Sequence, residues 1–411
     1  MSALDGIRVL DFTQVIFGPA ATQVLADHGA DVIKVERPGR GDLARAFGPW
    51  VKGESLPFAS LNRSKRSIVI NLKEEAGLDI IYRLLAETDV MVHNFRPGVM
   101  EKIGLDYGSI EARYPRLIYA VGSGYGSSGP YAERNKGGHE TMAQALSGVC
   151  AKFVGADGGP QRLPLTLADF TGGMLLAQGV LLALCARERS GRGQALETSL
   201  LDGMMSLQAW ETTGILNSDD AGDDTSFHPA EAGAGGSSHP QGNPLDGGVF
   251  RTADGHIMVT GVFGSFDELL RDLCGALGLA DLSADPRFCN LAAAIFNRDA
   301  LRSLLEPVFT TSPSADWIDR LEAAEILCAP VRSTAEALDD PQLMVNELIV
   351  EMDVPRVGLM CQVGTPLRLA GTPSRAPQPP PSIGEHTDAI REALGFDEPA
   401  VVDLHRRGVV A

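Results

Sequence analysis

The sequence predicts an α/β protein built around a parallel sheet with helices on both faces. Apolar segments alternate with helical segments along the first third of the chain, which is typical of parallel-sheet proteins. These apolar segments are continuously hydrophobic, as strands buried on both faces are. The chain has 411 residues and exceeds one ordinary domain of about 100–200 residues. A second, smaller domain is therefore expected.

The first elements follow one another as strand, helix and strand. Segments 7–12 (IRVLDF) and 31–36 (DVIKVE) are predicted to be buried strands. The helix between them, 19–28, has a proline in its first turn and a glycine after its end. Further strands are expected at 67–71, 90–95 and 117–121, and further helices at 76–86 and 107–114. Ligands bind beyond the carboxyl ends of parallel strands. The candidate binding segments are 13–18, 37–40, 94–98 and 122–126.

The composition changes near residue 217. Segment 219–248 is rich in Asp, Gly, Ser, Ala and Pro and predicts an exposed linker or a ligand-covering loop. A hairpin with strands 248–252 and 256–261 follows, with Asp254-Gly255 as its turn. The other elements expected downstream are helices at 266–277, 298–309 and 387–395. The linker and a small domain are therefore assigned to residues 218–330.

Charge and cysteine usage exclude several classes of protein. The formal net charge of −18 argues against nucleic acid as a partner. Six scattered cysteines without a CxxC pair indicate reduced core residues of a cytoplasmic protein. The N-terminus lacks the pattern of an export signal, and no membrane anchor is expected. Basic residues nevertheless crowd the first quarter of the chain. They form either a solvated face balanced by acids or a site for a phosphorylated ligand.

Asp169 lies in the most informative segment, LADFTGG at 167–173. This segment leads into an apolar helix over residues 174–186. An Asp there is a competent N-cap, worth about 1 kcal/mol, and the helix dipole favours its ionised form. The neighbouring glycines leave room for a ligand. The helix is apolar almost all round, so we expect it inside a core, and it is too short to span a bilayer. The cap and a nucleophile that carries an acyl group are compatible roles for this carboxylate.

Several strings along the chain together resemble one family. They are Gly18-Pro19, segment 29–38 (GADVIKVERP), segment 62–67 (NRSKRS), segment 94–98 (NFRPG), segment 167–169 (LAD), segment 191–194 (GRGQ) and segment 384–387 (GEHT). In this order they resemble the family III coenzyme A transferases, over residues 6 to about 395. The resemblance implies a Rossmann-like large domain made of residues 1–217 and 331–411, a smaller α+β domain, and an interlocked homodimer.

The resemblance also implies the chemistry of the site. Coenzyme A or acyl-CoA is expected as a substrate, together with a small carboxylic acid. No prosthetic group is expected, and no metal-ligand spacing is present. Asp169 matches the family nucleophile. It would attack the donor thioester to give a mixed anhydride, then an aspartyl-CoA thioester, from which CoA moves to the acceptor acid. The positions expected to contact CoA, including Gly122 from the strand-end argument, are Arg37, Leu72, Lys73, Asn94, Phe95, Arg96, Lys102, Gly122 and Lys136.

Two alternatives remain open. The α-methylacyl-CoA racemases share the matched aspartate and use it opposite a histidine about thirty residues earlier. Here Gly138-His139-Glu140 stands at that spacing, so His139 and Glu140 are candidate catalytic residues beside Asp169. An opposed acid and base is what inversion at the α-carbon requires. A non-catalytic CoA-binding partner subunit is the other alternative.

Overall fold

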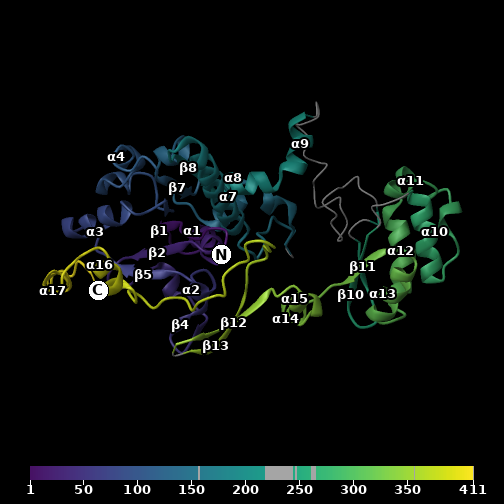
Figure 1. The fold of residues 1–411 in the computed structure, drawn as a ribbon. Helices are drawn as coiled ribbons and strands as arrows, with labels where there is room; N and C mark the ends of the chain where they lie inside the picture. The colour runs from purple at the N-terminus through teal and green to yellow at the C-terminus, as the bar shows by residue number, and fades with distance from the viewer. Residues whose placement is uncertain (156–157, 218–243, 246–247, 261–264, 356, 411) are drawn as a thin grey trace. The chain divides into compact units, whose positions relative to one another are not determined.

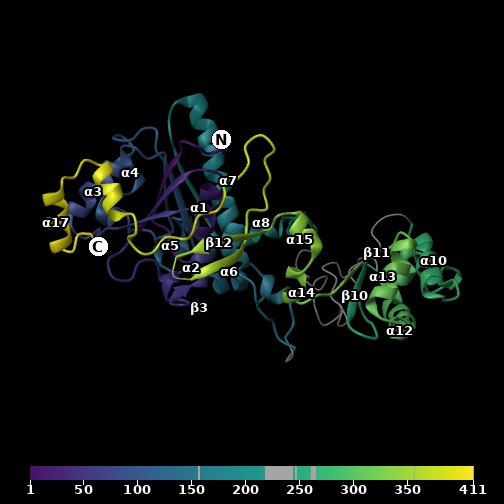
Figure 2. The ribbon, with the colours of Figure 1, turned by 60° about the horizontal axis from the view of Figure 1, so that its bottom comes forward.

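The computed structural model of the chain describes residues 1–155, 158–217, 244–245, 248–260, 265–355 and 357–410. The chain divides into two compact units. The first contains residues 1–149, 162–212 and 342–411, and the second contains residues 150–161 and 213–341. The C-terminal residues, drawn in yellow, return to the N-terminal unit (Figures 1 and 2). The expected linker at 219–248 falls almost entirely outside the described residues.

The first unit is built on a six-stranded sheet, and every pairing in it is parallel. Its strands are β1 (Arg8–Asp11), β2 (Asp31–Glu36), β5 (Arg66–Val69), β6 (Val90–His93), β7 (Ile118–Ser123) and β8 (Ala195–Ser199). The strand order is β5-β2-β1-β6-β7-β8. This is the order of doubly wound nucleotide-binding sheets, and the direction of winding reverses between β1 and β6. The predicted parallel sheet is confirmed.

Helices cover both faces of this sheet, and a separate hydrophobic core lies between the helices and each face. Successive residues of a strand therefore point into different cores. Val9 and Val90 join one core with helix residues such as Leu25 and Val180. Their neighbours on the strands, such as Leu10, join the other. The helices of the unit are α1 (Phe17–Asp27), α2 (Leu56–Ser60), α3 (Glu75–Leu85), α4 (Tyr107–Ile110), α5 (Pro130–Glu133), α6 (Glu140–Leu146), α7 (Leu167–Ser190), α8 (Leu200–Leu207), α16 (Thr387–Ala393) and α17 (Glu398–Arg406).

Short elements complete the first unit and its borders. They are the 3-10 helices η1 (Leu43–Ala46), η2 (Glu101–Ile103) and η3 (Val149–Lys152), the hairpins β3 (Trp50–Val51)–β4 (Glu54–Ser55) and β12 (Ile349–Val354)–β13 (Gly358–Val363), and the helices α9 (Ala209–Asn217) and α15 (Pro341–Val345).

Helix α7 differs from the sequence-based expectations in its length and in its burial. It has 24 residues, so it is longer than the predicted segment, and by length and composition alone it could cross a membrane. Only one side of it is buried: Leu176 and Val180 pack in the sheet core, as in the core helix of a globular protein. Met174 and Leu182 are 60% and 64% exposed. The expectation of a helix buried all round is therefore wrong.

The second unit is an α+β structure with its own core. Its antiparallel sheet has the order β11-β10-β9, from β9 (Gly248–Arg251), β10 (His256–Thr260) and β11 (Leu327–Pro330). The predicted hairpin between β9 and β10 is confirmed. Its helices are α10 (Phe266–Leu277), α11 (Leu291–Phe296), α12 (Arg298–Phe309), α13 (Ser314–Ala323) and α14 (Thr334–Leu338), with η5 at Leu282–Ala284. The buried Trp317 anchors the core and donates its indole N–H to the Phe309 carbonyl at 2.7 Å.

Candidate active site

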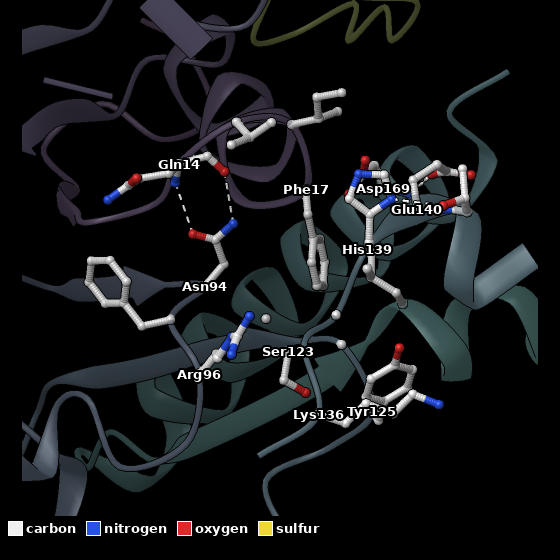
Figure 3. A pocket seen from close by; sticks show the side chains of 18 of the residues that line it. Gln14, Phe17, Asn94, Arg96, Ser123, Tyr125, Lys136, His139, Glu140 and Asp169 are labelled. Carbon is white, nitrogen blue, oxygen red and sulfur yellow. Dashed lines mark hydrogen bonds between the residues drawn. The ribbon is translucent and has the colours of Figure 1, made fainter. Parts of the chain in front are cut away.

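The candidate site lies where the winding of the sheet reverses. Gln14 follows β1 and Asn94 follows β6, and they exchange two hydrogen bonds of 2.8 Å between the Asn94 amide and the Gln14 backbone (Figure 3). A cavity of about 520 Å³ opens beside them. The predicted residues that line it are Asn94, Phe95, Arg96, Gly122, Lys136, His139, Glu140 and Asp169. Three of the four predicted segments at the strand ends thus contribute to one cavity.

Four residues expected to contact CoA are not part of this lining. Arg37 follows β2 and is exposed, with its Nε bonded to the Gly41 carbonyl at 3.2 Å. Leu72 is partly buried and packs against the core that contains Ile68 of β5. Lys73 and Lys102 are exposed. Arg37, Leu72 and Lys73 follow the strands on the far side of β1 from β6. The structure therefore does not bring these positions to the cavity that contains Asp169.

Asp169 occupies the first turn of α7, but it is not the N-cap. The helix begins after Thr166, and the side chain of Thr166 makes no capping bond. Glu140, a buried residue of α6, accepts hydrogen bonds from the N–H groups of Ala168 at 3.2 Å and Asp169 at 2.8 Å. The carboxylate that caps α7 is thus supplied by another helix. The predicted cap role of Asp169 is wrong, and its own carboxyl group lines the cavity.

The protonation of Asp169 also differs from expectation. Burial, followed by repulsion from Glu140, raises the pKa of Asp169 to about 7. The helix dipole was expected to favour the ionised form. Desolvation and the neighbouring carboxylate both favour the neutral form, which is opposite to the expected effect of the dipole. A carboxyl group poised near neutral pH is typical of catalytic sites.

The glycines near Asp169 allow close packing around Phe17. A Cβ on Gly172 would stand 2.8 Å from the Phe17 ring, and one on Gly122 would stand 2.9 Å from it. A Cβ on Gly173 would stand 2.8 Å from the Phe17 carbonyl oxygen. These glycines therefore let α7 and β7 close on the start of α1 around Phe17, which is buried. The expectation that the glycines beside Asp169 leave room for a ligand is wrong for Gly172 and Gly173, which do not line the cavity, whereas Gly122 does.

His139 is held as the N-cap of α6. Its Nδ1 accepts the Thr141 N–H at 3.3 Å and lies 2.9 Å from the Thr141 hydroxyl. The preceding Gly138 touches Gly124 after β7 so closely that a Cβ on either would lie 2.5 Å from the other Cα. This contact joins the loop after β7 to the start of α6, and His139 and Glu140 reach the same cavity as Asp169.

Sequence reasoning missed other residues of the cavity, among them Gln14, Tyr125 and Tyr131. The ammonium of Lys136 lies over the rings of Tyr131 and Tyr125, 4.5 and 5.3 Å from their centroids. Gln14 and Tyr125 fall within predicted strand-end segments, so position in the sheet could have indicated them. Tyr131 lies in α5, and no sequence pattern indicated it.

A buried ionic network holds the loop after β1. Lys34 and Lys65 are fully buried and pair with Asp42 at 2.8 Å and Asp11 at 3.3 Å. Burial opposes ionisation of Asp11, but attraction by both lysines and hydrogen bonds from Thr13 and Thr22 outweigh it and lower its pKa to about 2. Burial lowers the pKa of Lys65 to about 8 despite Asp11.

The network reaches the loop backbone through Asp42 and Lys34. Asp42 accepts the Val15 N–H at 3.0 Å, and Lys34 donates to the Thr13 carbonyl at 2.8 Å. Val15 takes a φ of 70°, which a β-branched residue rarely adopts. Several basic residues of the first quarter are therefore internal partners: Arg45, Arg63, Lys65 and Arg66 pair with acids. Arg96 and Lys136 instead face the cavity.

The described residues contain no group of three or more His, Cys, Asp or Glu side chains placed to hold a metal ion.

Comparisons with known proteins identify the family of this chain. Residues 4–387 match the model of CoA-transferase family III. The chain is 35% identical to the acetyl-CoA:oxalate CoA-transferase of Acetobacter aceti, over 96% of each chain. It is 32% identical to the succinyl-CoA:glutarate CoA-transferase of Mus musculus, over all of this chain and 91% of that one. A solved CAIB/BAIF family protein from Brucella suis superposes with a TM-score of 0.82 at 31% identity, over 96% of this chain and 99% of that one. The chain is an enzyme that belongs to CoA-transferase family III.

Proposed function

We propose that this enzyme moves coenzyme A from an acyl-CoA to a carboxylic acid through covalent intermediates on Asp169. The observation that carries the proposal is the place of Asp169. It lines the cavity at the switch point of the sheet, half-buried, with Glu140 bonded to its backbone. A carboxylate there can attack a thioester while the enclosing residues limit access of water to the anhydride.

The proposed steps conserve the activation of the acyl group. An Asp169 oxygen forms a bond to the thioester carbon, the C–S bond breaks, and CoA leaves as a thiolate. The thiolate attacks the Asp169 carbonyl carbon of the anhydride and expels the first acid as its carboxylate. The acceptor carboxylate then attacks the aspartyl thioester and regenerates the anhydride and the thiolate. Attack of the thiolate on the new acyl carbon releases the product and restores Asp169.

We propose that Asn94, Phe95, Arg96 and Lys136 hold CoA on the other side of this cavity. Arg96 and Lys136 supply the positive charge that phosphate groups require. Arg37, Leu72, Lys73 and Lys102 remain proposed contacts for the outer part of CoA, because Arg37 and Lys73 are exposed at the carboxyl ends of neighbouring strands and CoA is a long molecule.

Trapping of the intermediate tests the proposal. After incubation with an acyl-CoA, hydroxylamine is expected to convert Asp169 to a hydroxamate, which peptide mass spectrometry detects at this residue. Glu140, bonded to backbone N–H groups, should stay unmodified. If products exchange and no adduct ever forms on Asp169, the aspartyl mechanism is wrong.

The pH dependence offers a further test. Only the ionised form of Asp169 can attack, and its pKa is about 7, so kcat/KM should fall as the pH drops below 7. Glu140→Gln removes the negative neighbour but keeps an acceptor for the α7 N–H groups. The acidic limb of the profile should then move to lower pH, because repulsion contributes to the raised pKa. An unchanged limb would show that Glu140 does not influence Asp169.

We also propose the interlocked homodimer, with residues 1–217 and 331–411 forming the large domain. The outer face of α7 exposes the large apolar side chains of Phe170, Met174 and Leu182, and such side chains support an interaction surface there. Sedimentation of the pure enzyme tests this proposal, and a monomer would contradict it. A cytoplasmic location fits the six free cysteines and is tested by cell fractionation. Only Cys274 of the six is buried, so the expectation that all of them are core residues is wrong.

Racemisation is the second candidate function, because His139 and Asp169 line the same cavity. An imidazole and a carboxyl group on two sides of an α-carbon could exchange its proton. Exchange of the α-proton with deuterated solvent, in the absence of an acceptor acid, would support it. CoA binding without either reaction would instead indicate a non-catalytic partner subunit.

A further inference from the structure

The cavity that contains Asp169 has two chemically different walls. Arg96 and Lys136, which follow β6 and precede α6, lie on one side in Figure 3, and Gln14 and Asp169 lie on the other. The loop after β1 and the 3-10 helix η1 add apolar residues to the lining: Val15, Ile16, Phe17, Leu43 and Phe47. The first wall suits the phosphates of CoA, so the second is left for the acyl group.

Leu43 and Phe47 are presented to this cavity by a fixed backbone. Their side chains are 43% and 46% exposed. Asp42 caps η1 by accepting the Ala44 N–H at 2.8 Å, and Ser55 donates its hydroxyl to the carbonyls of Ala44 and Phe47 at 2.8 and 2.7 Å. Two large apolar side chains on a well-bonded segment at a cavity gain free energy when a ligand covers them.

Two cations beside this segment, Lys34 and Arg45, are already paired with acids. Lys34 is fully buried against Asp42 at 2.8 Å. Arg45 makes two hydrogen bonds to Glu36, of 2.8 and 2.7 Å, and its guanidinium lies 3.6 Å from the centroid of the Phe58 ring. A second carboxylate on a substrate, in contact with Leu43 and Phe47, would lose water without gaining a partner from Lys34 or Arg45. The other cations of the cavity are Arg96, Lys136 and Arg162.

We propose that the acids handled by this enzyme are monocarboxylates with an apolar chain longer than that of acetate, and that the chain lies against Leu43 and Phe47. The inference rests on the proposed function, because donor and acceptor acids are both joined to Asp169 and must both fit this wall. Phe47 and Leu43 are thus specificity residues. The named relatives that act on oxalate or glutarate take dicarboxylates, and this chain departs from them.

Identity exchange tests the inference without any assumption about a second acid. Hexanoyl-CoA is incubated with labelled hexanoate, and adipyl-CoA with labelled adipate, which has the same length and one more carboxylate. The hexanoyl pair is expected to exchange with a kcat/KM about tenfold or more above the adipyl pair, a discrimination typical of apolar pockets. Equal or faster exchange of the adipyl pair would overturn the inference.

Variants of Leu43 and Phe47 test whether these residues cause the preference for the hexanoyl pair. Phe47→Ser should lower the hexanoyl rate and leave the adipyl rate within a few-fold, and Leu43→Arg should shift the ratio toward adipyl by supplying a cation. Trp50→Ser is the matched control: Trp50 is 55% exposed in the same segment, lies across Gly48, and does not line the cavity. Its exchange ratio should not change. Equal effects of the Phe47 and Trp50 variants, or an unchanged ratio in both cavity variants, would contradict the assignment.

Different results would indicate failure of this inference and failure of the proposed function. If the enzyme exchanges dicarboxylates and forms the Asp169 adduct, only the substrate class is wrong. If products exchange without any adduct on Asp169, the aspartyl mechanism is wrong whatever the acid.

Discussion

Asp169→Asn is expected to lower turnover by about a thousandfold or more while the affinity for CoA stays within a few-fold. The amide cannot form an anhydride that conserves the thioester's activation, so the covalent route is lost. Affinity should persist because Asn94, Arg96 and Lys136, the residues proposed to hold CoA, come from other elements. Steady-state exchange gives the loss of rate, and titration calorimetry with free CoA gives the affinity.

A control and a stability measurement make this prediction specific. Asp202 stands in the first turn of α8, outside the cavity lining, and Asp202→Asn should keep most of the activity.

The folded-state pKa of Asp169 is raised to about 7, above the ordinary value near 4 of an unfolded chain. Its ionisation therefore lowers the free energy of unfolding as the pH rises toward and through 7. Above that pH Asp169→Asn should be more stable than the parent, by on the order of 1–2 kcal/mol after allowance for partial exposure. A large loss of both stability and CoA affinity would instead mark Asp169 as structural.

Asp11→Ala is expected to lower the free energy of unfolding by about 3–5 kcal/mol, the range found when one partner of a buried pair is removed. Asp11 is fully buried and accepts hydrogen bonds from Thr13, Thr22 and Lys65. Without it, Lys65 would lose its compensating charge inside the protein. The loop after β1, which carries the cavity residues Gln14 to Phe17, would lose one of its anchors as well. Urea unfolding at neutral pH measures the change.

The matched control lies on the surface. Asp79 pairs with Arg83 one turn away on α3, with both side chains about half exposed, and Asp79→Ala should cost less than about 1 kcal/mol. Because the pKa of Asp11 is lowered to about 2, its stabilising effect is present above the ordinary carboxyl pKa and is lost as the pH falls from about 4 toward 2. Equal effects of the two variants would show that the buried network does not stabilise the fold.

Local patterns in the sequence are sufficient for the parallel sheet and for several elements. Strand β2 and helices α10 and α12 span the predicted residues, because continuous apolar runs and helical periodicity are properties of a few neighbouring residues. Strand β8 was missed, because this edge strand, ALETS, has only two apolar residues and neither an apolar run nor an alternating pattern. Helix α7 was predicted too short, because its first turns contain Asp169, Thr171 and two glycines.

The sequence by itself determined the sheet class, three strand-end segments that line the cavity, and Asp169 as the candidate nucleophile. Only the tertiary structure decided that Glu140, twenty-nine positions before Asp169, caps α7 and helps to raise the pKa of that carboxyl group. Only the tertiary structure also decided that the glycines around Asp169 admit Phe17 and that Arg37 and Lys73 stand away from the cavity. The reason is physical. Burial, charge repulsion and close packing depend on which distant segments meet, and neither periodicity nor local spacing contains that information.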